Sequence, residues 1–102
     1  IHVSDLANIH IKTLKYIKKN SKSLILNCGY GKPYSVLDIA NIFKKKDKNA
    51  QINFKKRRPG DIAEVYSNTK KIDKILNLKL KYNNLEYILN SAYKWEKKIN
   101  SI

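Results

Sequence analysis

The amino-acid sequence predicts an α/β fold in which about four helices alternate with a few short strands. Four segments repeat apolar residues every three or four positions, which is the spacing of an amphipathic helix. Between them lie short apolar or alternating runs bounded by turn residues, as is typical of strands. These runs hold roughly four or five residues each, which is too few and too short for a free-standing sheet. We therefore expect a piece whose strands partly complete a sheet elsewhere.

The first helix is expected from about residue 6 to residue 19. Residues 1–3 have the pattern of an extended entry, and Ser4-Asp5 offers an N-cap with an acidic first turn. Apolar side chains recur at helical spacing as far as Ile17. Two lysines then suit the negative end of the helix dipole, and Asn20-Ser21 ends the helix.

The middle of the chain predicts two strands around a second helix. The apolar run at residues 23–29 predicts a buried strand, and a loop at residues 29–34 follows it. Ser35 is the expected cap of the second helix, whose last turn holds the lysines at residues 44–46. The second strand is expected at residues 51–54, with both of its apolar side chains on one face.

The C-terminal part predicts two more helices. Asn68 is the expected cap of a short helix whose isoleucines face inward. Residues 77–82 alternate apolar and polar side chains and are expected to be extended. The last helix is expected at about residues 85–99, with Trp95 on its apolar face. No repeat or long linker divides the chain, so we expect residues 1–102 to form a single domain.

Composition narrows the classes of protein. No run of about 18 apolar residues is present, which argues against a membrane span. The single cysteine, Cys28, excludes an intrachain disulfide and fits a reducing, cytoplasmic setting. The chain begins at Ile1 and contains no methionine. We therefore expect a piece of a longer protein that carries only part of a site.

The net charge of +14 suggests an anionic partner such as a nucleic acid. However, all but two of the 22 basic residues are lysines, and lysine, isoleucine and asparagine make up almost half of the chain. Genome composition can supply such a charge, and many of these lysines fall on expected polar helix faces or in turns. Nucleic-acid binding is therefore the weaker alternative.

The segment 55–68 is the main candidate for a binding site. It holds both arginines of the chain, a Pro59-Gly60 turn and Asp61. A guanidinium is a planar fork that suits phosphate or carboxylate oxygens, and a carboxylate can accept hydrogen bonds from a pair of hydroxyls. A solvated surface turn is the alternative that composition leaves open.

No reaction centre is evident. The two histidines and Cys28 lack the spacing of a zinc site. We expect His10 to be a core or interface residue and Cys28 to be an inert apolar side chain. Gly29-Tyr30-Gly31 lacks the third glycine of a dinucleotide fingerprint. The sequence thus predicts neither catalytic, nor metal-binding, nor cofactor-binding residues.

Five segments, in order, resemble landmarks of one family. They are Ile1–Ala7, Leu26–Val36, Arg57–Asp61, Ser67–Lys71 and Ala92–Trp95. Together they are similar to the C-terminal third of the UDP-glucose 4-epimerase family, within the extended short-chain dehydrogenase/reductase superfamily. The match covers essentially the whole chain. Ser67-Asn68 stands where the family usually has Ala-Asp, and either residue pair can cap a helix.

The resemblance implies an isomerase of galactose and nucleotide-sugar metabolism that inverts C4 of a UDP-hexose through a transient 4-keto sugar. It implies that NAD is bound by an N-terminal Rossmann domain outside this chain, and that this chain is the substrate-binding cap. It assigns the diphosphate to Arg58, the ribose hydroxyls to Asp61, and to Val65 a position beside the sugar. The small Val65 leads us to expect tolerance of N-acetylated hexoses.

The same resemblance implies partners. We expect the chain to contact its own Rossmann domain, the intact protein to be a homodimer, and the isolated chain to be inactive and prone to self-association. Sister nucleotide-sugar enzymes, namely UDP-glucuronate epimerases and decarboxylases and dTDP-glucose dehydratases, share the fold and parts of these motifs. They remain the alternative.

Overall fold

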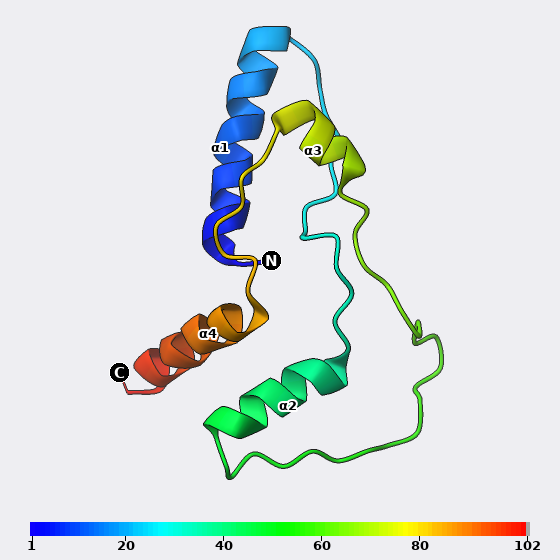
Figure 1. The fold of residues 1–102 in the computed structure, drawn as a ribbon, viewed down its shortest axis with the longest axis vertical. Coiled ribbons are helices and arrows are strands. Elements are labelled where there is room, and N and C mark those ends of the chain that lie inside the picture. Colours follow the sequence, from blue (N-terminus) through cyan, green and yellow to red (C-terminus); the bar gives the residue numbers. More distant parts are fainter. Residues whose placement is uncertain (102) are drawn as a thin grey trace. The chain divides into compact units, whose positions relative to one another are not determined.

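A computed structural model describes residues 1–101, which contain four α-helices (Figure 1). They are α1 (Val3–Asn20), α2 (Val36–Lys46), α3 (Lys70–Leu76) and α4 (Leu85–Asn100). The four expected helices are thus confirmed. No strand forms within residues 1–101, so the expected short strands are not confirmed. A strand is defined by the ladder that it makes with a neighbour, and the segments at residues 23–29 and 51–54 form no such ladder here.

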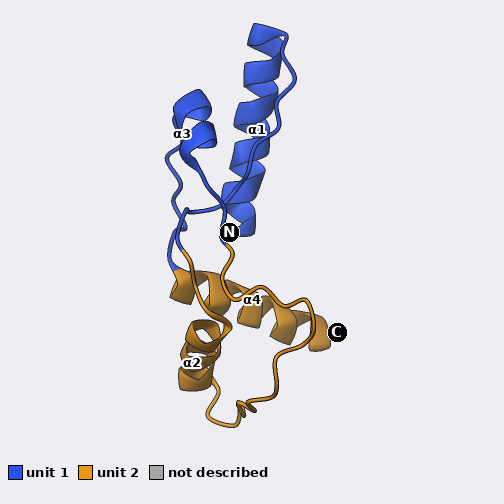
Figure 2. Ribbon diagram, turned by 90° about the vertical axis from the view of Figure 1, so that its right-hand side faces the viewer, with its two compact units in different colours: residues 1–32, 66–84 blue, residues 33–65, 85–102 orange. Residues whose placement is uncertain are grey.

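The chain divides into two compact units (Figure 2). Unit 1 consists of residues 1–32 and 66–84 and contains α1 and α3. Unit 2 consists of residues 33–65 and continues from residue 85 to the end of the described chain, with α2 and α4. Each unit is therefore assembled from two segments that are far apart in the sequence.

In unit 1, helices α1 and α3 pack together through a very small core. Ile9 of α1 and Ile72 of α3 are the two hydrophobic side chains that are fully buried among the described residues. Helix α1 begins earlier than the sequence predicted. Its N-cap is His2, whose ring Nδ1 accepts a hydrogen bond from the Ser4 amide at 3.1 Å. The expected cap at Ser4-Asp5 is therefore wrong, whereas the expected acidic first turn is confirmed by Asp5.

The start of α3 also differs by one residue from the prediction. Thr69 occupies the N-cap position without a capping side-chain bond. Asn68 still satisfies the first turn, because its Oδ1 accepts a hydrogen bond from the Lys70 amide at 3.1 Å. Just before it, Ser67 lies against the backbone of Gly29: a Cβ built on that glycine would lie only 2.1 Å from the Ser67 Oγ. Gly29 thus permits a close approach between two segments of unit 1.

In unit 2, helix α2 begins as the sequence predicts. Ser35 and Asp38 form a capping box: the Ser35 hydroxyl accepts from the Asp38 amide at 2.9 Å, and the Asp38 carboxylate accepts from the Ser35 amide at 3.0 Å. Helix α2 packs on α4, where the Phe43 and Tyr93 rings meet edge to face with centroids 5.4 Å apart. The capping box thus fixes the start of α2, and the ring contact joins α2 to α4 within unit 2.

Large apolar side chains remain exposed in both units. Ile25 in unit 1, and Val36 and Phe54 in unit 2, are each more than four-fifths exposed. None of the described helices combines the length and the hydropathy that crossing a bilayer requires. Exposed apolar surface of this extent is characteristic of regions that contact other protein.

Candidate functional site

A tight turn brings together Arg58 and Asp61, two of the residues predicted to bind substrate. Pro59 and Gly60 occupy its central positions, and Gly60 has a φ of 82°, a left-handed value that glycine adopts without strain. The Asp61 amide donates to the carbonyl oxygen of Arg58 at 3.2 Å. Pro followed by Gly with positive φ is the signature of a type II turn. The Arg-Pro-Gly-Asp order therefore sets the spacing between the cation and the carboxylate.

One oxygen of the Asp61 carboxylate holds Arg58 in place. Oδ2 of Asp61 accepts from the Arg58 amide at 3.1 Å and from its Nε at 3.2 Å. The Arg58 side chain is 85% exposed, and within residues 1–101 its two terminal amino groups have no other partner. These two groups can still donate to the oxygens of a phosphate. Oδ1 of Asp61 likewise stays available to accept from a hydroxyl.

Val65, the third predicted site residue, lies in a groove of unit 2 with a volume of about 630 Å³. The groove is lined by residues 33–36 and 62–65 and by Asp38. Neither Arg58 nor Asp61 lines it. The structure therefore joins two of the three predicted residues in one turn and places Val65 in a groove that begins just after that turn.

The groove lining is chemically mixed. Tyr34, Val36 and Val65 offer apolar surface, whereas Ser35 and the carboxylates of Asp38 and Glu64 offer hydrogen-bonding groups. Asp38 is already engaged by the Ser35 amide in the capping box. Apolar walls with a few polar groups are typical of small-molecule sites. Such a lining suits a sugar, which presents both hydroxyls and C–H surface.

Unit 1 contains a buried polar network that the sequence did not predict. Asp5 in the first turn of α1 is 2% exposed, and its carboxylate accepts from the Tyr30 hydroxyl at 2.7 Å. It also accepts from the backbone amides of Lys81 at 3.1 Å and Tyr82 at 3.0 Å. The His2 ring stacks on Tyr82, with centroids 4.7 Å apart. A single carboxylate thus joins three segments that are distant in the sequence.

The network shifts the pKa of both acidic groups. Burial of Asp5 alone would favour its neutral form, but the hydrogen bonds from Tyr30 and from the backbone of Lys81 and Tyr82, helped by nearby His2, lower the pKa of the carboxyl below its ordinary value. Burial and the bond to the Asp5 carboxylate raise the pKa of Tyr30 to about 12. Both shifts stabilise the ionised aspartate and the neutral tyrosine, which is the pair that the hydrogen bond requires.

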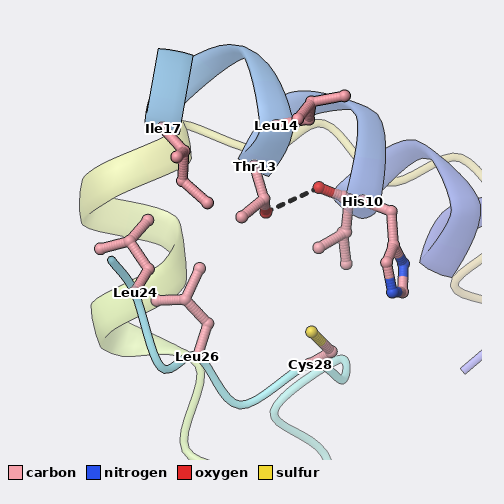
Figure 3. A pocket seen from close by; sticks show the side chains of 8 residues that line it. His10, Thr13, Leu14, Ile17, Leu24, Leu26 and Cys28 are labelled. Atoms are coloured by element: carbon pink, nitrogen blue, oxygen red, sulfur yellow. Dashed lines mark hydrogen bonds between the residues drawn. The ribbon is translucent and has the colours of Figure 1, made fainter. Parts of the chain in front are cut away.

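A second, mostly apolar groove of about 360 Å³ runs along α1 in unit 1 (Figure 3). Figure 3 shows Leu24, Leu26 and Cys28 of the extended segment directed toward the helix. His10 lines the groove but is exposed, with its Nδ1 2.8 Å from the carbonyl oxygen of Leu6. His10 is therefore not a core residue of unit 1, because α1 buries only Ile9 and Asp5, and its expected place at an interface stays a prediction. Among the described residues, no three His, Cys, Asp or Glu side chains gather to hold a metal ion.

Curated proteins with known names are similar to this chain over most of its length. A UDP-glucose 4-epimerase of Azospirillum brasilense is 33% identical over 100 residues, which is 97% of this chain and 29% of that protein. A UDP-arabinose 4-epimerase 1 of Arabidopsis thaliana is 41% identical over 98 residues, or 95% of this chain and 23% of that protein. A bifunctional UDP-glucose and UDP-xylose 4-epimerase 1 of Pisum sativum is 37% identical over 100 residues, or 95% of this chain and 28% of that protein.

The chain therefore spans about a quarter of the length of the curated relatives that it matches. No protein-family model matches it. The matched region of the relatives is their C-terminal part. The chain is therefore homologous to the C-terminal part of UDP-sugar 4-epimerases.

Proposed function

We propose that this chain is the substrate-binding C-terminal part of an NAD-dependent UDP-hexose 4-epimerase. The observation that carries the proposal is the alignment of nearly the whole chain with about a quarter of several UDP-sugar 4-epimerases. The Arg58–Asp61 turn supports it, because the turn presents a phosphate donor and a hydroxyl acceptor within four residues. A sister nucleotide-sugar enzyme is the alternative, and the choice between them depends on the sugar that is turned over.

We assign the UDP group to the turn. The exposed amino groups of Arg58 donate to diphosphate oxygens, while its Nε stays bonded to Asp61. Oδ1 of Asp61 accepts from a ribose hydroxyl. The Asp61–Arg58 bond limits the rotamers of the guanidinium, so less side-chain entropy is lost when phosphate binds. Val65 lies beside the sugar, where a small side chain leaves room for an N-acetyl group.

The reaction itself requires groups outside the described residues. NAD, when bound, supplies the transient removal and return of hydride at C4. A dinucleotide phosphate is held where a glycine turn opens directly into a helix. Here Gly31 is followed by an extended segment, and α2 begins only at Val36. The residues at 1–101 do not fit the cofactor, so we assign NAD and the catalytic groups to an N-terminal Rossmann domain of the intact protein.

The extended segment 23–28 supports a partner domain of this kind. Leu24, Leu26 and Cys28 line the groove along α1, while Ile25 between them is 87% exposed. Ile25 thus adds an apolar side chain to the opposite face, between Ser23 and Asn27, and apolar side chains on both faces are typical of a strand buried within a parallel sheet. We propose that this segment pairs as a strand with the sheet of the Rossmann domain, which would complete the expected α/β fold. The isolated chain, without that cover, is expected to self-associate.

A homodimer of the intact protein and a reducing, cytoplasmic setting belong to the same proposal. The half-buried free thiol of Cys28 agrees with the reducing setting. The exposed apolar side chains on α2 and α4 agree with a dimer interface.

The proposal is tested by activity of the intact protein on UDP-glucose and UDP-galactose. The wild type should interconvert them, and Arg58→Ala should raise KM by about ten- to 150-fold, as for the loss of a charged hydrogen bond of ~1.5–3 kcal/mol. Arg57→Ala is the matched control, since it removes an equal charge one residue away. A wild type without epimerase activity on any UDP-sugar would refute the proposal, and turnover by the isolated chain would refute the assignment of the catalytic groups.

A further inference from the structure

One edge of the extended segment 23–28 is contacted by a lysine of unit 1. The Nζ of Lys71, in the first turn of α3, donates to the carbonyl oxygen of Ile25 at 2.9 Å. Ser67, four residues before Lys71, lies against Gly29, four residues after Ile25. The residues from Ser67 to Lys71 therefore run beside those from Ile25 to Gly29, and all of them belong to unit 1.

This contact distinguishes the two edges of the segment. In an extended chain the amide and the carbonyl of one residue point to the same edge, and those of the next residue point to the opposite edge. Because the Ile25 carbonyl points to Lys71, we call the edge formed by the backbone of residues 23, 25 and 27 the Lys71 edge. The backbone groups of Leu24, Leu26 and Cys28 form the open edge. Within residues 1–101 these groups make no hydrogen bond.

A second strand cannot add at the Lys71 edge without displacing an ammonium group. It would compete for the Ile25 carbonyl oxygen, and it would remove water from the charge on Nζ, which costs free energy. Lysine beside an edge strand is a common means by which natural proteins prevent such pairing. At the open edge, no side chain of residues 1–101 stands in the way of a backbone ladder.

We propose that Lys71 closes one edge of the segment 23–28, so that the sheet of the Rossmann domain pairs through the open edge alone. The segment is then the last strand of that sheet. This inference rests on the proposed function, which supplies the partner domain: the chain matches only 23–29% of the length of its relatives. The unpaired backbone of the open edge is the surface that this domain covers.

Site-resolved hydrogen exchange in the intact protein tells the two edges apart, because an amide in a ladder is protected and an amide at a free edge is not. Relative to their intrinsic rates, the amides of Leu24 and Leu26 should exchange at least about 100-fold more slowly than those of Ile25 and Asn27. Slow exchange of all four would place the segment inside the sheet. Slow exchange at the Lys71 edge alone, or fast exchange of all four, would equally overturn the inference.

Lys71→Met tests the role of the lysine itself, with Lys70→Met as the matched control. Each removes one exposed charge from the start of α3, and within residues 1–101 the Lys70 side chain makes no hydrogen bond. In sedimentation velocity, the intact Lys71→Met protein should form higher assemblies at about tenfold lower concentration than the wild type, because its second edge is free to pair. Lys70→Met should match the wild type.

The same behaviour in both variants would overturn the role of Lys71. Epimerase activity of the same preparations tests the proposed function separately, since neither the exchange pattern nor the state of assembly depends on turnover.

Discussion

The close approach of Gly29 to Ser67 allows the packing of unit 1 to be tested with a single added methyl group. A methyl group at Gly29 would lie 2.1 Å from the Ser67 Oγ and 3.3 Å from the Ser67 Cβ. The hydroxyl can rotate away, but the Cβ contact is already tight, so Ser67 or the backbone must shift. Overpacking of this kind typically costs about 1–3 kcal/mol. Gly29→Ala should therefore destabilise unit 1 by that amount.

Hydrogen exchange in the intact protein measures this cost locally, because it reports the opening of one unit rather than global unfolding. Protection of the slowest amides of α1 and α3 should fall by roughly five- to 150-fold in Gly29→Ala. Removing the obstructing hydroxyl in Gly29→Ala/Ser67→Ala should restore part of the protection, while Ser67→Ala alone should have little effect. Wild-type protection in Gly29→Ala, or no recovery in the double variant, would show that residues 29 and 67 do not pack as described.

Because the folded pKa of Asp5 is lowered and that of Tyr30 is raised to about 12, their stabilisation of unit 1 should be complete between about pH 4 and pH 10. This stabilisation should be lost as the pH falls through the lowered pKa of Asp5, and again as the pH rises toward 12. Absorbance titration should show one late-ionising tyrosine that disappears in Tyr30→Phe. Persistence of that late ionisation in Tyr30→Phe would contradict the network. Ser35→Ala should destabilise α2 by about 1 kcal/mol through loss of the capping box, as measured by hydrogen exchange of the α2 amides with Ser23→Ala as the control. Equal exchange rates in the two variants would show that the cap does not stabilise α2. Val65→Tyr should abolish turnover of UDP-GlcNAc by the intact protein and spare UDP-glucose; if the wild type does not turn over UDP-GlcNAc above background, the assignment of Val65 fails.

Local patterns in the sequence predicted the helices well. The capping box at Ser35 involves only residues three apart, and the spacing of Ile72 relative to its neighbours identified the buried face of α3. The Arg58–Asp61 turn was also predictable, because Pro-Gly chemistry and a carboxylate within four residues define it. Each of these features depends on interactions within one turn of chain.

Features that depend on distant segments could not be predicted in this way. Asp5 has the pattern of an ordinary acidic first-turn residue, and only the approach of Tyr30 and residues 81–82 turns it into a buried hydrogen-bonding centre. His2, and not the expected Ser4, takes the N-cap position, and its ring Nδ1 accepts from the Ser4 amide. Residues 23–29 carry a strand pattern, but a strand needs a partner ladder, and no such partner lies within residues 1–101. The roles of Arg58, Asp61 and Val65 remain predictions.

Calorimetric titration of UDP into the intact protein tests the central assignment most directly. Arg58→Ala should weaken UDP binding by about ten- to 150-fold, since it removes charged hydrogen bonds to phosphate. Arg57→Ala, which lowers the net charge equally, should stay within about threefold of the wild type, because an exposed charge contributes little. Equal losses in the two variants would show that only general electrostatic attraction is at work, and unchanged binding in Arg58→Ala would contradict the assignment of the diphosphate to the Arg58–Asp61 turn.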